Sequence, residues 1–242
     1  MTARSSFGHE HPWHHMLHAH FTLGALTLGV DAGFSAPWSI LFGPSGSGKS
    51  SILRALSGLL RSVPSTVIRH VEGLSVNLTS LPPSGRAMAY APQHAAIFPH
   101  LTVRQNIAFS ATIRHQPTTL AGEAIALFDL APLADRSPER LSGGERQRVN
   151  LARAFAVPEA KLMVLDEPFT GLDLKLRDQL IPRMQQFLTA RNLPCISVTH
   201  DVDEALLLNA EVLRIDAGRV LAQGQARTVL AEERTRLLDS LR

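Results

Sequence analysis

Residues 43–50 read GPSGSGKS, and they are the strongest indication of the fold in this sequence. Gly43, Gly48, Lys49 and Ser50 stand at the spacing of a phosphate-binding loop, which predicts a nucleoside triphosphate site. Because glycine has no Cβ, the backbone N–H groups of such a loop can curl around phosphate oxygens, and the following helix directs its positive end at the same charge. We expect Lys49 to reach the β- and γ-phosphates and Ser50 to ligate Mg²⁺. The candidate nucleotide-binding residues of the loop are Gly43, Pro44, Ser45, Gly46, Ser47, Gly48, Lys49, Ser50 and Ser51.

The segments that flank the loop predict a buried strand and a helix. Residues 38–42 form an apolar run interrupted only by Ser39, and apolar residues recur at helical spacing over 52–60. Further buried strands are expected at 162–165 and 194–199, each followed by a polar loop and a helix. Before residue 42 the apolar residues alternate, which is typical of short antiparallel strands. These patterns predict an α/β P-loop NTPase with a mainly parallel core sheet and an N-terminal antiparallel β subdomain.

Between Gln93 and Val157 the strand signal disappears and helical patterns dominate, at 103–113, 121–130 and 145–155. We interpret this region as an inserted α-helical lobe. The whole chain, 1–242, is then a single domain, with a core at about 16–93 and 157–225, a lobe at about 94–156 and one amphipathic C-terminal helix at about 226–242.

Composition sets limits on the function. With 242 residues and 45% apolar content the chain can bury one large core. It has no uninterrupted apolar run of the roughly 18 residues that a membrane span needs, so we expect a cytosolic location. The single cysteine, Cys195, excludes an intramolecular disulfide and lies in an apolar run, where a buried core position is expected. The net charge of +3 gives little support to nucleic-acid binding.

Residues 141–148 read LSGGERQR, which resembles the signature motif of ABC ATPases. Ser142, Gly143 and Gly144 precede a helix, so a hydroxyl and backbone N–H groups can form a second anion site. In that family the signature of one subunit faces the phosphate loop of the other, and two ATP molecules lie between them. The resemblance therefore implies ATP as ligand and a homodimer or close pseudo-dimer.

Residues 161–168 read KLMVLDEP, which is similar to the Walker B segment of the same family. The resemblance implies that Asp166 holds Mg²⁺ through its water shell and that Glu167 polarises the attacking water as general base. The continuation TGLD at 170–173 implies that Asp173 is the D-loop carboxylate at the dimer interface. A pair of solvated capping carboxylates is the structural alternative.

Two further positions complete a resemblance that spans 21–224. Gln93 looks like the Q-loop glutamine, which contacts Mg²⁺ and the γ-phosphate and joins the helical lobe to the core. His200 looks like the switch histidine that contacts the γ-phosphate. The family usually stacks adenine on an aromatic residue upstream of the phosphate loop. His20 and Phe21 are the best-placed candidates, and a core position for Phe21 stays open.

Residues 97–107, IFPHLTVRQNI, resemble bacterial importer subunits, and the acidic segment that exporters carry before the signature is absent. LDEPFTGLD at 165–173 looks most like the molybdate and sulfate group of oxyanion transporters. The resemblance implies integral membrane permease subunits, which dock a coupling helix beside Gln93, and an extracytoplasmic substrate-binding protein. It places the chain peripherally at the cytoplasmic face of the inner membrane.

Other functions remain as alternatives: an ABC system with another substrate, an exporter, or a non-transport ABC ATPase. A chromosome or DNA-repair ATPase would need a long coiled coil between Gln93 and the signature, and the spacing excludes it. A translation-associated ABC protein usually has two ATPase units, and only one occurs here. A nonenzymatic binding module would be expected to lose Lys49 or Glu167, and both are present.

Histidines gather near the N-terminus. The cluster consists of His9, His11, His14, His15, His18 and His20. Such imidazoles can capture Zn²⁺ or Ni²⁺ adventitiously, but no cysteine or carboxylate ligand set of fixed spacing accompanies them. The alternative is a solvated tail followed by an edge strand.

Overall fold

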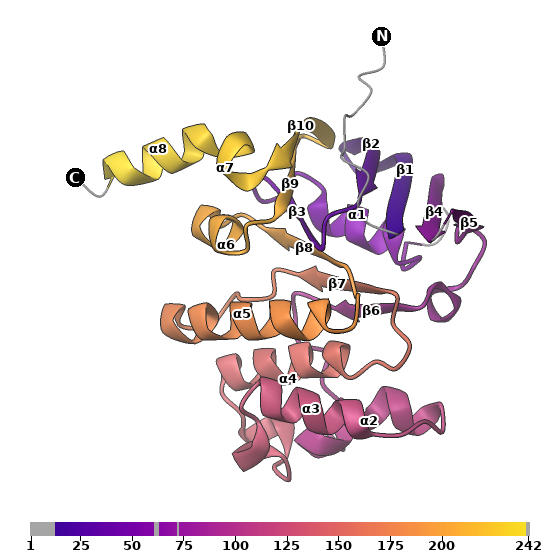
Figure 1. The fold of residues 1–242 in the computed structure, drawn as a ribbon, viewed down its shortest axis with the longest axis vertical. Helices are drawn as coiled ribbons and strands as arrows, with labels where there is room; N and C mark the ends of the chain where they lie inside the picture. Colours follow the sequence, from indigo (N-terminus) through magenta and orange to yellow (C-terminus); the bar gives the residue numbers. More distant parts are fainter. Residues whose placement is uncertain (1–12, 61–62, 72, 241–242) are drawn as a thin grey trace.

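Ten strands form one sheet in the computed structural model, which describes residues 13–60, 63–71 and 73–240 (Figure 1). The strands are β1 Trp13–Leu23, β2 Leu26–Phe34, β3 Trp38–Phe42, β4 Ser65–Val71, β5 Leu74–Asn77, β6 Met88–Ala91, β7 Leu162–Asp166, β8 Cys195–Thr199, β9 Glu211–Asp216 and β10 Arg219–Gln225. The helices are α1 Lys49–Leu56, α2 Val103–Ile113, α3 Thr119–Leu127, α4 Gly143–Phe155, α5 Leu174–Thr189, α6 Val202–Leu207, α7 Ala226–Val229 and α8 Ala231–Ser240, with short 3₁₀ turns at Pro83–Arg86, Ala131–Leu133 and Pro138–Arg140.

The strand order is β5-β4-β1-β2-β10-β9-β3-β8-β7-β6. Strands β3, β6, β7, β8 and β9 are joined by parallel pairs, whereas β1 pairs antiparallel with β2 and β4, and β4 with β5. The predicted α/β class, with a mainly parallel core and an N-terminal antiparallel part, is therefore confirmed. Between β6 and β7 the described chain contains helices and no strand, and α2, α3 and α4 lie together at one end of the molecule (Figure 1).

The sheet separates two hydrophobic cores. Every residue of β3 is buried, and neighbouring side chains point to opposite faces, so that Ile40 enters one core and Leu41 the other. The core that holds Leu41 also contains the buried face of α1. The core that holds Ile40 also takes side chains from α2, α3, α4 and α5. Burial on both faces explains why β3 is apolar at every position except Ser39.

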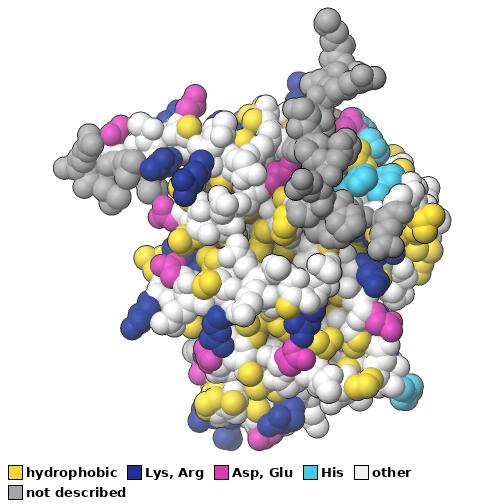
Figure 2. Space-filling model, viewed as in Figure 1, with side chains coloured by type: hydrophobic (Ala, Val, Ile, Leu, Met, Phe, Trp, Pro, Cys, Tyr) yellow, Lys and Arg dark blue, Asp and Glu magenta, His cyan; other side chains and the backbone are white. Residues whose placement is uncertain are grey.

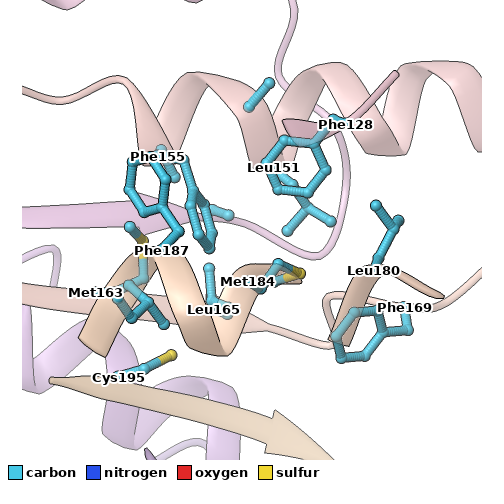
Figure 3. Close-up of a cluster of buried hydrophobic side chains, with 14 of the residues drawn as sticks. Phe128, Leu151, Phe155, Met163, Leu165, Phe169, Leu180, Met184, Phe187 and Cys195 are labelled. Atoms are coloured by element: carbon cyan, nitrogen blue, oxygen red, sulfur yellow. The ribbon is translucent and has the colours of Figure 1, made fainter. Parts of the chain in front are cut away.

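Aromatic rings join the lobe helices to α5 in the larger core (Figure 3). The ring centroids of Phe128 and Phe155 are 5.1 Å apart, and those of Phe155 and Phe187 are 5.2 Å apart. Cys195, the first residue of β8, lies in the same core, and burial raises the pKa of its thiol well above the ordinary value. The expected buried core position of the cysteine is confirmed.

Two segments differ from the prediction. The first helix ends at Leu56, because Gly58 adopts a left-handed φ of 73° and the chain turns away before Leu59. Residues 226–240 form two helices, α7 and α8, in place of the single helix expected at 226–242. The two helices are separated at Leu230, which has a φ of −106° and whose side chain is completely buried in the core. Residues 241–242 lie outside the described residues.

Charged side chains of both signs are scattered over the face in Figure 2, and histidines gather beside the antiparallel strands. No described helix is long and apolar enough to cross a membrane. His9 and His11 lie outside the described residues. His14 stacks on His70 with 4.2 Å between ring centroids, and His15 is buried.

The two remaining histidines of the cluster bind a carboxylate. His18 Nδ1 lies 2.7 Å from Asp31 Oδ1, and His20 Nε2 lies 3.0 Å from both carboxylate oxygens. These hydrogen bonds lower the pKa of Asp31. Over the described part of the chain, no group of three or more histidine, cysteine, aspartate or glutamate side chains could hold a metal ion.

Candidate nucleotide site

The phosphate loop connects β3 to α1, and its glycines are required by their surroundings. A Cβ on Gly43 would lie 2.0 Å from the carbonyl oxygen of Ile215, and Gly43 has a φ of 158°. A Cβ on Gly48, which has a φ of 99°, would lie 2.4 Å from a methyl carbon of Leu28. No other residue type fits either position without moving the backbone or the core. The loop is therefore clamped between the sheet and the N-terminal strands.

A turn far along the chain braces the loop from outside. Gly218, between β9 and β10, donates its N–H to the Ser47 carbonyl at 3.1 Å, and its own carbonyl accepts from the Gly29 N–H at 2.8 Å. Ala217 and Gly218 both have left-handed φ angles, of 44° and 78°. The contact between Gly218 and Ser47 was not predicted from the sequence, although residues Asp216, Ala217 and Gly218 are typical of a turn.

The Lys49 side chain folds over its own loop. Its Nζ donates to the carbonyl oxygens of Gly43 at 2.8 Å and Pro44 at 2.7 Å, and the residue is 5% exposed. Burial lowers the pKa of the ammonium, and the nearby carboxylates Glu167 and Asp166 oppose that effect. The loop thus holds one buried cation in contact with its backbone.

A carboxylate and a hydroxyl meet beside the loop. The Ser50 Oγ donates to Asp166 Oδ1 at 2.8 Å, and Tyr90 donates to Asp166 Oδ2 at 3.3 Å. Burial raises the pKa of Asp166, which is 1% exposed. A cation would offset this cost, and both groups offer the oxygen ligands that Mg²⁺ prefers, so the residues fit the ion. Tyr90 had no predicted role.

The side chain of Glu167 contacts two other predicted site residues, Gln93 and His200, and also Thr170. Its Oε2 accepts from Gln93 Nε2 at 3.1 Å and from Thr170 Oγ1 at 3.1 Å, and its Oε1 lies 3.4 Å from His200 Nδ1. Its backbone has a left-handed φ of 47°, which is strained for a residue with a side chain, and its N–H donates to the Val198 carbonyl at 3.1 Å. The ends of β6, β7 and β8 thus bring Gln93, Glu167 and His200 together.

The signature residues form the start of α4. Ser142 is the N-cap, with its Oγ accepting from the Glu145 N–H at 3.3 Å while Glu145 bonds back to the Ser142 N–H at 2.7 Å. Ser142 and Gly143 are exposed. A Cβ on Gly144 would lie 3.3 Å from the Gly171 carbonyl, so the signature adjoins the loop that leads to Asp173. Among the described residues, no hydrogen bond or ion pair joins 142–144 to the loop at 43–51.

Asp173 and the adenine candidates have other neighbours. Asp173 caps α5, with Oδ1 accepting from the Leu176 N–H at 2.9 Å. Phe21 is 7% exposed and belongs to the core on the α1 side, so it presents no free ring face. His20 is exposed but hydrogen-bonded to Asp31. The core alternative for Phe21 is the one that the structure supports.

Fold and loop together define an α/β P-loop NTPase. Residues 35–170 match the family described as ABC transporter, so the chain belongs to the ABC transporter family. It is 36% identical over 211 residues to the molybdate/tungstate import ATP-binding protein WtpC of Archaeoglobus fulgidus, covering 86% of each chain. It is 34% identical over 219 residues to the molybdenum import ATP-binding protein ModC of Methylococcus capsulatus, covering 89% of this chain and 61% of that one.

The chain thus spans about three fifths of the length of this ModC relative. Among solved structures, cbiO1 from Clostridium perfringens, part of the ABC transporter complex cbiONQ, superposes with a TM-score of 0.76. The two chains are 21% identical, and the match covers 94% of each, so this likeness concerns the fold alone.

Proposed function

We propose that the chain is the ATP-binding and ATP-hydrolysing subunit of an importer for molybdate or a similar oxyanion. The observation that carries the proposal is the placement of Glu167. Its carboxylate, 15% exposed, is held by Gln93, Thr170 and His200 on the strand ends beside the phosphate loop. A carboxylate fixed at this position can orient a water molecule and accept its proton.

The loop residues, 43–51, would hold the phosphates. Lys49 now bonds the carbonyls of Gly43 and Pro44, and on nucleotide binding it would exchange these contacts for charge-assisted contacts with phosphate oxygens. Ser50, Asp166 and Gln93 would hold Mg²⁺. When bound, this ion would offset negative charge on the phosphates.

In the hydrolysis step Glu167 would accept the proton of the attacking water. Gln93 keeps the carboxylate in place through its amide, and the exposed imidazole of His200 is free to turn from Glu167 towards the γ-phosphate. Since Glu167 contacts both residues, movement of either would alter the position of the base. The hydrolysis site therefore includes three strand ends.

The signature would act on a partner's nucleotide. Ser142, Gly143 and Gly144 form a helix start that can bind an anion, and Ser142 and Gly143 are exposed. Their lack of contact with the phosphate loop of the same chain supports a homodimer or pseudo-dimer in which each loop faces the other chain's signature. The exposed Leu174, next to Asp173, would lie at this interface.

A recess beside the Q-loop segment would receive the permease. It has a volume of about 160 Å³ and is lined in part by Tyr90, Ala96, Phe109 and Val157. Its lining also includes Asn106, Ser110 and Arg153, and this mixture of apolar and polar side chains suits a short amphipathic helix of an integral membrane subunit. The chain would then lie at the cytoplasmic face of the membrane, in a system that includes an extracytoplasmic binding protein. The oxyanion assignment rests on the named import relatives.

Hydrolysis tests the site. Glu167→Gln keeps the shape of the side chain but cannot accept the proton, so ATP should still bind while the turnover rate falls by about 10²-fold or more. The exposed Glu232→Gln makes the same charge change on α8 and should leave turnover unchanged. Wild-type turnover in Glu167→Gln would remove Glu167 from the role of base.

Mixing two variants tests the shared sites. Lys49→Ala damages the phosphate loop, and Ser142→Arg obstructs the signature. In a mixed dimer the intact loop of the second chain faces the intact signature of the first, so the mixture should hydrolyse ATP, or dimerise on ATP addition, more than either parent. Full activity of Ser142→Arg alone would contradict the shared-site arrangement.

The oxyanion is tested with the complete transporter. The chain, its permease and its binding protein are reconstituted in vesicles, and ATP hydrolysis is compared with molybdate, sulfate or an amino acid as the only added substrate. Stimulation by molybdate is expected. Stimulation by the amino acid alone would contradict the oxyanion assignment and leave the ATPase assignment intact.

A further inference from the structure

One face of α4 carries two buried amide side chains. Gln147 is 6% exposed and Asn150 is 3% exposed, and they lie one helical turn apart. A buried amide without partners costs free energy, so its hydrogen bonds indicate why it is there. Gln147 Nε2 donates to the Pro168 carbonyl at 2.9 Å, and Asn150 Nδ2 donates to the Pro92 carbonyl at 2.8 Å.

Both acceptors are direct neighbours of the proposed hydrolysis residues. Pro168 follows Glu167, and Pro92 precedes Gln93. The side chains of Glu167 and Gln93 are themselves hydrogen-bonded at 3.1 Å. Adjacent turns of α4 thus bind the backbone next to Gln93 and next to Glu167, whose side chains are bonded to each other.

The loops that carry Gln93 and Glu167 need contacts from outside the sheet to fix their conformation. Strands β6 and β7 end at Ala91 and Asp166, so Gln93 and Glu167 lie just beyond the sheet ladder. Glu167 also has a left-handed φ of 47°, a conformation that persists in such residues only where the surroundings impose it. The Glu167 carbonyl itself lies 3.5 Å from Gln147 Nε2. One more turn along, Arg153 donates to the Ala96 carbonyl of the segment that begins at Gln93.

We infer that Gln147 and Asn150 are positioning residues that set the separation of Gln93 and Glu167. The inference rests on the proposed function. Because α4 begins at Ser142, the helix that would bind the partner's nucleotide also sets the geometry of hydrolysis in its own chain. A displacement of α4 would therefore reach Gln93 and Glu167 together. Asn150 also lines the recess proposed for the permease, so a docked helix could act on the same contact.

Alanine variants of the full-length protein test the inference. Gln147→Ala and Asn150→Ala remove the donors but leave 43–51 untouched, so kcat should fall by about 10-fold or more while ATP affinity, measured with a fluorescent analogue, stays within about twofold. The matched control is Gln185→Ala, on α5, which loses the same kind of contact, the bond from Gln185 Nε2 to the Leu208 carbonyl at 2.9 Å. Assayed at a temperature well below its melting temperature, this control should keep the wild-type kcat.

A double-mutant cycle separates positioning from general damage. If Asn150 acts through Gln93, Asn150→Ala should lower kcat much less in a Gln93→Ala background than in the wild type. Equal losses in both backgrounds, an unchanged kcat in both alanine variants, or an equal loss in Gln185→Ala would each overturn the inference. Asn150→Leu and Gln147→Met keep side-chain volume and are used in the cycle if the alanine variants do not fold.

The same assay distinguishes a failure of the positioning inference from a failure of the proposed function. If hydrolysis depends on Glu167 but not on residues 147 and 150, only the positioning inference fails. If the wild type does not hydrolyse ATP at all, the proposed function fails and the inference fails with it.

Discussion

The buried carboxyl of Glu204, behind the His200 segment, should make the stability of the protein fall as the pH rises. Glu204 is 5% exposed; its Oε2 accepts from Thr199 Oγ1 at 2.9 Å, while its Oε1 lacks a partner among the described residues. Burial, reinforced by the charge of Asp201, raises its pKa from the ordinary 4.5 to about 8. The Thr199 hydrogen bond and the guanidinium of Arg177 oppose this rise.

The sign and size of the effect follow from proton binding. Between pH 4.5 and 8 the folded state keeps a proton that the unfolded chain has released, so the free energy of unfolding decreases with pH in that window. At about 1.4 kcal/mol per pKa unit, the penalty reaches about 3 kcal/mol at pH 7 and about 5 kcal/mol above pH 8. Glu204→Gln removes the titration, and its own amide can still accept from Thr199.

Urea denaturation at pH 5, 6, 7 and 8 provides the measurement. Glu204→Gln should gain stability relative to the wild type by up to about 1.4 kcal/mol for each pH unit across the window. A constant cost of about 1–3 kcal/mol from the unpartnered amide would shift the whole curve without changing its slope. Glu232→Gln, exposed on α8, controls for net charge. A stability difference between Glu204→Gln and wild type that does not vary with pH would refute the reasoning.

Three other predictions concern stability, each measured by chemical denaturation. His15 is buried with both ring nitrogens unpartnered among the described residues, and burial lowers its pKa to about 3. Because the unfolded chain takes up a proton below pH 6.5, His15→Leu should remove an acid-sensitive loss of about 2 kcal/mol at pH 5; equal acid sensitivity of variant and wild type would contradict this. Gly43→Ala should destabilise by about 3 kcal/mol or more, since the added carbon meets a backbone carbonyl, whereas Gly122→Ala, in open space on α3, should stabilise by about 0.5–1 kcal/mol. Asp173→Ala should lose about 1 kcal/mol through the missing cap of α5, and an unchanged midpoint would count against that cap.

Strong local patterns predicted much of the fold. The five buried residues of β3 and the periodic residues of α2 are found at their predicted bounds, because a doubly buried strand and an amphipathic helix are each specified within a few residues. Strands β9 and β10 were not predicted. Strand β10 pairs with β9 and, through Arg219, with Gly29 of β2, so its place depends on a contact with a distant segment.

The candidate site was predicted through its motifs, and its supports were not. Resemblance to a family identified Gln93, Glu167 and His200, whose side chains the structure brings together. The burial of Gln147 and Asn150, the donors that hold the Gln93 and Glu167 loops, could not be predicted, because asparagine and glutamine side chains mostly lie on solvated faces. Only the fold shows that they face inward.

The brace on the phosphate loop also constrains when the site can form. Ser47 is made early in synthesis, but Gly218, which holds its carbonyl, follows after almost the whole remaining chain. A ribosome-bound chain that stops before β10 would carry all the loop residues without their outer support. Because distant contacts form late in folding, we expect the loop to take up nucleotide only after the C-terminal strands have emerged and paired. Nascent chains of increasing length, probed with a fluorescent ATP analogue, should therefore start to bind only once β10 has left the exit tunnel.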